Sequence, residues 1–205
     1  MSNPPADDGS FRVRLKARML QIAERLLEED GLAGVQARVI AKEADCAVGT
    51  LYNIFNGLDG LIIAANTQTL RAFGRAGEAA MRRLASRPFG EQLEALALAY
   101  LDFAIAHPRR WKAVFDHQMP DSEDVPAPYR ADQNRLFALI EAPLVAIIAD
   151  AGERASAARS LFAAVHGIVA LALDRKLGPF DAAETERQVR FIVGLMSRGL
   201  AARGT

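Results

Sequence analysis

The 205-residue chain carries 25 basic and 25 acidic side chains, so its formal net charge at neutral pH is zero. Its composition, 51% hydrophobic and 24% charged, is typical of a globular protein with a buried core. The balanced charge excludes a protein that binds nucleic acid through its overall charge alone. The single cysteine, Cys46, excludes an intrachain disulfide and favours a cytoplasmic location, where thiols stay reduced.

The N-terminal ten residues, MSNPPADDGS, lack the basic and apolar regions of a secretory signal, and we expect a disordered lead-in. The longest apolar run, LFAAVHGIVALAL, stops at Asp174 after 13 residues, which is shorter than a membrane span. We therefore expect no membrane partner.

Apolar residues recur at helical spacing along almost the whole chain, and the first such pattern predicts a helix that ends near Gly31. The breaks between patterns predict eight further helices, over residues 38–44, 48–55, 58–86, 89–106, 109–117, 129–151, 153–177 and 181–202. Pro143 marks a kink or a break, and the acidic, proline-containing segment 119–128 is expected to be a loop. No stretch alternates like a β-strand, so the fold class is predicted to be all-α with about nine helices.

The first three helices have the order of a helix-turn-helix DNA-binding domain, over residues 11–57. On the helix 48–55, Leu51, Ile54 and Phe55 stand at positions i, i+3 and i+4, so they are expected to face the protein. The small and polar residues of the same helix are left to meet bases and phosphates, together with one arginine of the preceding helix. These candidate DNA contacts are Arg38, Val48, Gly49, Thr50, Tyr52 and Asn53.

Charge patterning allows DNA binding only through a local positive face. Residues 1–63 hold seven basic and nine acidic residues, a net charge of −2. Affinity for DNA depends mainly on neutralised phosphates, so a basic cluster must supply the contacts. The cluster Arg12, Arg14, Lys16 and Arg18 contains no acid and is predicted to form a basic arm.

Residues 19–61 resemble the DNA-binding domain of the TetR family of transcriptional repressors. The matching features are Ile40-Ala41, Ala44, the segment GTLYNIF at 49–55 and Leu61. The resemblance implies that residues 58–205 form a helical domain, entered through a long helix at about 58–86, that binds a small-molecule effector and dimerises. It implies a cytoplasmic repressor that leaves a palindromic double-stranded DNA operator when the effector binds. It also places Gln36 and Ala47 among the DNA contacts.

The sequence departs from the family pattern at four positions near the turn. The family commonly has Thr at Gln36, Gly at Asp45, Ser at Ala47 and Lys at Leu58. Asp45 can adopt the left-handed conformation that such a turn requires. Ala47 lacks the hydroxyl that would cap the helix, which removes about 1 kcal/mol, and Leu58 lacks a cation near the DNA backbone. A helical sensor or adaptor with weakened or lost DNA binding is therefore the alternative.

The second half of the sequence holds the candidate effector and dimer residues. The run LFAAVHGIVALAL resembles a His-Gly motif found in one group of the family's C-terminal domains, with Phe162 where that group usually has Trp. An apolar or aromatic effector is expected to bind among aromatic and histidine side chains of this half, for which ordinary core packing is the alternative. The pocket candidates are Phe103, His107, Trp111, Phe115 and His166. The dimer candidates on the last two helices are Phe162, Val169, Val193 and Met196.

The sequence offers no constellation for catalysis. The three histidines, His107, His117 and His166, are not at metal-ligand spacings, and neither a glycine-rich phosphate loop nor a nucleophile with a base is visible. We expect no enzyme, metal or cofactor. His166 is interpreted as a hydrogen-bonded structural histidine, with a ligand or proton-sensing role as the alternative. Cys46 is interpreted as a small buried hydrophobe, with redox sensing as the alternative.

Overall fold

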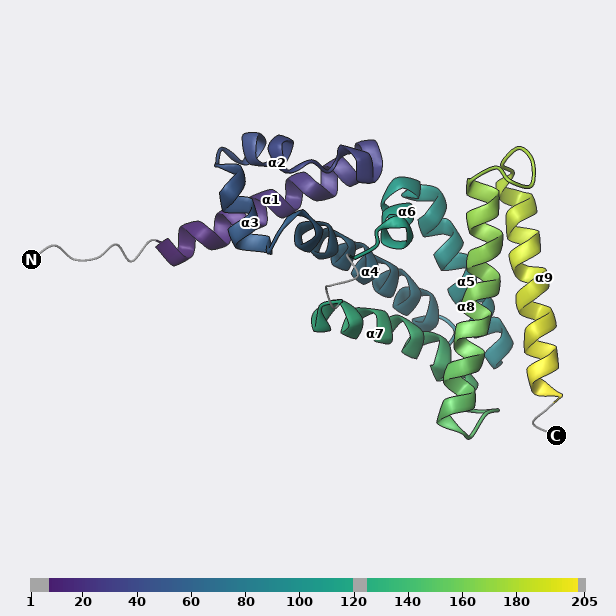
Figure 1. Ribbon diagram of the computed structural model, residues 1–205. Coiled ribbons are helices and arrows are strands. Elements are labelled where there is room, and N and C mark those ends of the chain that lie inside the picture. The colour runs from purple at the N-terminus through teal and green to yellow at the C-terminus, as the bar shows by residue number, and fades with distance from the viewer. Residues whose placement is uncertain (1–7, 120–124, 203–205) are drawn as a thin grey trace, which may run out of the picture. The chain divides into compact units, whose positions relative to one another are not determined.

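A computed structural model describes residues 8–119 and 125–202 of the chain. Within these ranges all regular secondary structure is helical, which confirms the predicted all-α fold (Figure 1). The elements are α1 (Asp8–Asp30), the 3-10 turn η1 (Gly31–Gly34), α2 (Ala37–Ala44), α3 (Val48–Phe55), α4 (Leu58–Arg82), α5 (Phe89–Ala106), α6 (Pro108–Asp116), α7 (Ala127–Leu144), α8 (Ala151–Leu173) and α9 (Ala182–Ala201).

Most predicted boundaries hold within a few residues, and three differ in an informative way. Helix α1 already begins at Asp8, inside the expected lead-in, whose first seven residues lie outside the described part. Helix α7 begins at Ala127, within the predicted loop, and residues 120–124 of that loop are not described. It ends at Leu144, directly after Pro143, because the proline has no N–H to donate to the carbonyl of residue 139 and its ring crowds that carbonyl, which weakens the helix there.

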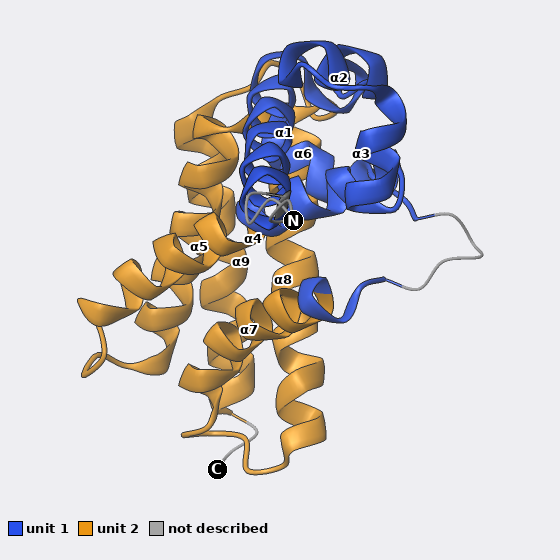
Figure 2. Ribbon diagram, turned by 90° about the vertical axis from the view of Figure 1, so that its left-hand side faces the viewer, with its two compact units in different colours: residues 1–69, 109–129 blue, residues 70–108, 130–205 orange. Residues whose placement is uncertain are grey.

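The chain divides into two compact units, which are coloured separately in Figure 2. Unit 1 comprises residues 1–69 and 109–129, and unit 2 comprises residues 70–108 and 130–205. Unit 1 is larger than the predicted DNA-binding segment 11–57, because it also includes the first part of α4 and most of α6. Helix α4 contributes residues to both units.

Each unit has its own apolar core. In unit 1 the core cluster joins α1, α2, α3 and the start of α4, and its largest fully buried side chains are Met19, Leu27, Ile40, Leu51 and Leu61. In unit 2, α5 packs against α8 and α9, and α8 packs against α9. Leu101, Val169, Val189 and Val193 are fully or almost fully buried there. Burial of a side chain of this size contributes roughly 1.5–3 kcal/mol to the free energy of unfolding. In unit 1 this burial holds the short helices α2 and α3 in place.

Helix α8 corrects the expectation about apolar length. Among the described residues, α8 is the one unbroken helix that is long and apolar enough to span a membrane, and its mean hydropathy is 1.6. The pair α3 and α4 passes the same test only if its 61° bend is ignored. The uninterrupted apolar run covers only residues 161–173, but the alanine-rich residues at the start of α8 lengthen the apolar part of the helix. Such a composition also fits a bundle helix, and Leu161, Val165 and Val169 bury one face of α8 in unit 2.

Candidate nucleic-acid interface

Helix α3 is fixed to unit 1 by one face and leaves the other face exposed. Leu51 has no accessible surface, Phe55 is 8% exposed, and Ile54 packs against the same core cluster. All three therefore face the protein, as their spacing predicts. On the flank of this buried face Tyr52 is 50% exposed and Val48 is 36% exposed, although both have side chains that cores often bury, and Gly49 and Asn53 on the opposite face are exposed. An exposed face with this composition on a short, well-anchored helix suits contact with another molecule.

The structure brings the eight candidate DNA contacts together on two neighbouring segments of unit 1. Seven of them are exposed, and Thr50 is half-buried; the full set is Gln36, Arg38, Ala47, Val48, Gly49, Thr50, Tyr52 and Asn53. Gln36 precedes α2, and its Nε2 donates to the carbonyl oxygen of Ala33 at 3.2 Å. Gly49 has no heavy atom within 4 Å of the position a Cβ would take, so a close approach to α3 is open there.

The turn between α2 and α3 uses the backbone conformation expected from the sequence. Asp45 ends α2 with φ 57° and ψ 55°, the left-handed region that favours glycine and tolerates aspartate. The N–H groups of Asp45 and Cys46 donate to the carbonyl oxygens of Lys42 and Ala41 at 3.2 and 3.0 Å. These bonds satisfy two of the last four carbonyls of α2 and close the helix at the turn that leads to α3.

Helix α3 starts without a side-chain cap. Ala47 occupies the N-cap position with extended backbone, φ −72° and ψ 146°, and has no side-chain oxygen to accept a hydrogen bond. The Thr50 N–H donates to the Ala47 carbonyl oxygen at 2.9 Å. The first N–H groups of α3 are therefore left without a capping side chain, which agrees with the expectation for Ala47.

The four basic residues near the N-terminus lie on α1 and not on an extended arm. Arg12 Nη2 donates to the carbonyl oxygen of Asn53 at 3.2 Å, and Arg18 Nη2 donates to that of Glu43 at 2.7 Å. Lys16 Nζ lies 5.5 Å from the centroid of the Phe55 ring. Arg14 donates to Ser10 within α1. The arginines thus bind carbonyls at the C-terminal ends of α2 and α3, where partial negative charge accumulates.

The start of α4 contains two contacts that sequence reasoning missed. Gly60 lies so close to α3 that a Cβ on it would be 1.8 Å from the Phe55 carbonyl oxygen. The Asp59 carboxylate lies 3.5 Å from His117 Nε2, and burial lowers the pKa of His117, against the opposing effect of Asp59. Leu58, at the first position of α4, packs against the core cluster of unit 1. A helical pattern alone signals neither the close approach nor the pairing.

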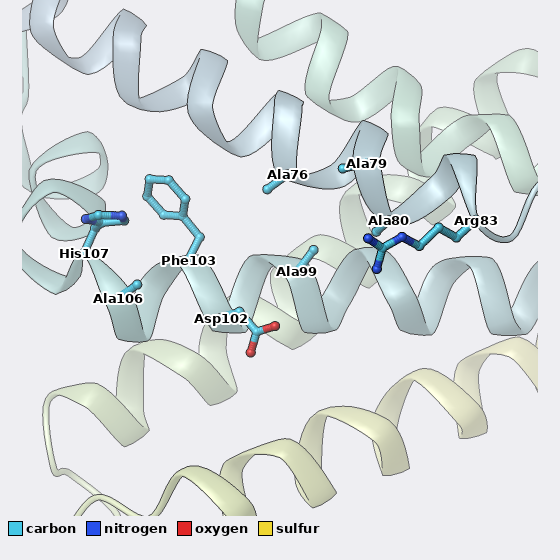
Figure 3. A pocket seen from close by; sticks show the side chains of 9 residues that line it. All are labelled: Ala76, Ala79, Ala80, Arg83, Ala99, Asp102, Phe103, Ala106 and His107. Atoms are coloured by element: carbon cyan, nitrogen blue, oxygen red, sulfur yellow. The ribbon is translucent and has the colours of Figure 1, made fainter.

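Unit 2 contains a groove between the end of α4 and α5, with a volume of about 430 Å³ (Figure 3). It is lined by Ala76, Ala79, Ala80, Arg83, Ala99, Asp102, Phe103, Ala106 and His107. Two of the pocket candidates, Phe103 and His107, belong to this lining, and their ring centroids are 4.8 Å apart. The volume is within the range of small-molecule sites.

The other three pocket candidates lie elsewhere. Trp111 and Phe115 belong to unit 1, where their ring centroids are 5.3 Å apart and Trp111 is 4% exposed. His166 Nδ1 is 2.8 Å from the Tyr100 hydroxyl in unit 2, and its ring stacks on Phe162 at 5.5 Å. Burial lowers the pKa of His166. This hydrogen bond agrees with the interpretation of His166 as a structural histidine.

The dimer candidates divide by burial. Val169 and Val193 are 0% and 2% exposed, so they pack inside the chain and are not accessible to a second copy. Phe162 and Met196 are half-buried. Helical spacing identified the apolar face of each helix correctly, but that face is covered by the chain's own bundle. The exposed large apolar side chains of α8 and α9 are Leu171, Phe191 and Leu195.

The clustering and the burial of the described side chains decide whether they can act as metal ligands or as reactive thiols. Residues 8–119 and 125–202 contain no group of three His, Cys, Asp or Glu side chains that could hold a metal ion. Cys46 is half-buried against the core cluster of unit 1. Burial, and secondarily the Asp45 carboxylate, raises the pKa of the Cys46 thiol, which keeps it protonated and unreactive.

Two family models match the chain, one in its N-terminal part and one in its C-terminal part. The model described as bacterial regulatory proteins of the tetR family matches residues 19–65, and the tetracyclin repressor-like C-terminal domain matches residues 93–196. The chain belongs to the TetR family. It is a TetR-family transcriptional regulator with a helix-turn-helix DNA-binding domain, and the family is not one of enzymes.

Solved structures of similar fold cover nearly the whole TetR-family chain. A protein of unknown function from Rhodococcus sp. RHA1 is 24% identical, with a TM-score of 0.72 over 91% of this chain and 95% of that one. A TetR transcriptional regulator from the same organism is 20% identical, with a TM-score of 0.62 over 90% and 96%. RolR in complex with resorcinol is 18% identical, with a TM-score of 0.62 over 88% and 95%. No curated protein matches the chain.

Proposed function

We propose that the protein is a cytoplasmic repressor that binds a near-palindromic operator as a homodimer and leaves it when a small apolar or aromatic molecule binds. The observation that carries the DNA-binding part is the division of α3, with Leu51 and Phe55 buried while Tyr52, Asn53 and Gly49 are exposed. Asparagine and threonine can bind base edges in the major groove, and a tyrosine hydroxyl suits a phosphate oxygen. In a two-fold dimer the two α3 helices would contact half-sites roughly 34–36 Å apart, or a multiple of it.

A mobility-shift assay tests this proposal with duplexes from the DNA upstream of the protein's own coding region. We expect a shift that weakens as salt rises, and a loss of affinity in Tyr52→Ala and Asn53→Ala. Asn134→Ala is the matched control, because Asn134 is an exposed asparagine on α7. A folded protein that shifts none of the fragments would reject the proposal.

The alternative is a sensor or adaptor of the same fold that does not bind DNA. Two observations favour it: α3 lacks a capping side chain at Ala47, and Leu58 packs into the core where the family often has a lysine. The mobility-shift assay separates the two functions directly. A folded dimer that responds to ligands and shifts no DNA would support the adaptor.

The proposed dimer uses the exposed apolar side chains of the last two helices. Phe191 is 66% exposed, Leu171 is 44% exposed and Leu195 is 43% exposed, and such a group on neighbouring helices is typical of an interface. Phe191→Glu should give a folded monomer by light scattering coupled to size exclusion. Ala138→Glu is the control, because Ala138 is an exposed helical residue on α7. A Phe191→Glu protein that stays dimeric would place the interface elsewhere.

The proposed effector site is the groove in unit 2. The alanine side chains and Phe103 that line it offer an apolar surface. Because RolR, a structure of similar fold, binds resorcinol, a small aromatic compound is the first ligand to test. The His-Gly motif around His166 supports assignment of the C-terminal half to that group of the family. Resorcinol and related phenols should raise the melting temperature and release DNA. Ala99→Phe should abolish both effects by filling the groove, whereas Ala163→Phe, on exposed α8 surface, should not.

A further inference from the structure

The first part of α1 is a helical segment that the family match does not include. Helix α1 begins at Asp8, whereas the match to the DNA-binding domain begins at residue 19. This segment carries Arg12, Arg14, Lys16 and Arg18, and the sequence has no acid from residue 9 to residue 23. Because residues 1–63 have a net charge of −2, these four cations form a local positive region in an otherwise acidic part of the chain.

Two of these cations are held against the recognition helix α3. Arg12 and Lys16 stand at positions i and i+4, so they share one face of α1. Arg12 donates to the Asn53 carbonyl oxygen, and Lys16 lies over the Phe55 ring. The neighbouring side chain Leu15 is 7% exposed and docks this part of α1 on the core of unit 1. Both cations are therefore ordered next to the C-terminal half of α3, beside which the start of α1 lies in Figure 1.

The charge of these two residues is not neutralised within the described part of the chain. Further along α1, Arg25 is paired with Glu29 and Glu43, each at 2.5 Å. The recorded partners of Arg12 and Lys16 are a carbonyl oxygen and an aromatic ring, neither of which carries a negative charge. A guanidinium has five N–H donors and an ammonium has three, so both exposed groups keep donors for an anion.

We propose that Arg12 and Lys16 bind DNA phosphates beside the groove that α3 enters. The proposal rests on the proposed DNA-binding function and adds a contact surface outside the helix-turn-helix itself. Two positions near α3 offer no such contact, because Ala47 has no hydroxyl and Leu58 has no charge. The start of α1 supplies two cations beside the C-terminal half of α3. These contacts raise affinity without reading sequence, since phosphates are the same at every base pair.

The test measures DNA affinity of the full-length protein over a series of salt concentrations, on the duplex that the wild type binds. The double variant R12Q/K16Q should bind at least several-fold more weakly on specific and on unrelated duplexes. The slope of log affinity against log salt should fall by about 0.9 for each phosphate contact that is lost. Arg75→Gln is the control, because Arg75 is an exposed arginine of unit 2 with no ion pair among the described residues.

Charge-conserving variants separate phosphate binding from a purely structural role of the two side chains. Arg12→Lys and Lys16→Arg should keep wild-type salt slopes, because the positive charge remains. The single variant Lys16→Gln keeps the Arg12 hydrogen bond. Its salt slope should fall by about half as much as that of R12Q/K16Q, and it serves as the test if the double variant melts early. Unchanged affinity in folded R12Q/K16Q would overturn the inference. It would also be overturned if Arg12→Lys bound DNA as weakly as R12Q/K16Q while its salt slope stayed at the wild-type value. A wild type that binds no duplex would instead reject the proposed function, and this inference with it.

Discussion

Asn66 on α4 and Ala113 on α6 are joined by a fully buried hydrogen bond. Asn66 Nδ2 donates to the Ala113 carbonyl oxygen at 3.0 Å, and Asn66 has no accessible surface. The two residues are 47 positions apart in the sequence, yet both belong to unit 1. This bond is one reason why residues 109–129 group with the DNA-binding helices.

Removal of this bond should destabilise the protein. Asn66→Ala deletes the donor and creates a small cavity, so the free energy of unfolding should fall by about 1–3 kcal/mol. Urea unfolding followed by circular dichroism measures the change. Asn134→Ala, at an exposed position, should stay within about 0.5 kcal/mol of the wild type. If both variants were equally stable, the Asn66 bond would contribute nothing net.

Two glycines near α3 should respond to alanine in opposite ways. At Gly60 a Cβ would meet the backbone carbonyl oxygen of Phe55 at 1.8 Å, so the turn between α3 and α4 must shift. Gly60→Ala should lower the free energy of unfolding by about 3 kcal/mol or more. At Gly49 the space is open, and alanine favours a helix by up to about 1 kcal/mol. Gly49→Ala should therefore leave the fold intact or stabilise it.

The same Gly49→Ala variant should bind DNA more weakly than the wild type. Its new methyl group projects from the exposed face of α3, where we propose that DNA approaches the helix closely. Thermal melting and the mobility-shift assay together separate the two effects. A Gly49→Ala protein that is stabilised and binds DNA as well as the wild type would contradict the proposed close approach.

Much of unit 1 was predictable because its signals are local. The spacing of Leu51, Ile54 and Phe55 identified the anchored face of α3, and the need for a left-handed residue at Asp45 followed from the tight turn. The N-terminal cations were visible as a cluster, but their arrangement was not. No sequence pattern indicates that Arg12 reaches a carbonyl on a helix 41 positions away.

In unit 2, periodicity identified apolar faces without saying what covers them. The stripe that contains Val169 and Val193 is a real apolar face, but the chain's own helices bury it. Phe191 and Leu195, which remain exposed, stand two positions before and after Val193 and therefore lie on the opposite side of α9. The aromatic residues around His107 were also divided between the units, because α6 belongs with unit 1 and α5 with unit 2. Such choices depend on tertiary packing, to which a single sequence gives no direct access.

Stability should decrease as the pH falls from about 7.5 to 5.5. Burial lowers the pKa of both His117 and His166 in the folded protein from the usual 6.5. As the pH falls through 6.5, the unfolded chain therefore binds protons before the folded chain does, and the stability present above that pH is lost. Urea unfolding at pH 7.5, 6.5 and 5.5 measures the loss.

Variants at the histidines assign the pH dependence. His117→Asn and His166→Asn should each flatten the curve between pH 7.5 and 5.5. Asp59→Asn should steepen it, because the Asp59 carboxylate favours the protonated form of His117. An Asp59→Asn curve that is flatter than the wild type would show that Asp59 acts in the opposite sense.

The uncapped start of α3 leads to a prediction of improved stability and improved binding. Ala47 already has the extended backbone of an N-cap residue, so a serine there needs no backbone change. Its hydroxyl oxygen can accept from the N–H of Gly49 or Thr50, and Ala47→Ser should raise the free energy of unfolding by about 1 kcal/mol. Because position 47 is exposed beside the proposed DNA contacts, the hydroxyl can also bind a phosphate, so DNA affinity should rise with it. Ala47→Val, which adds bulk without an oxygen, should improve neither quantity. Equal effects of serine and valine would mean that the first turn of α3 limits neither stability nor DNA binding.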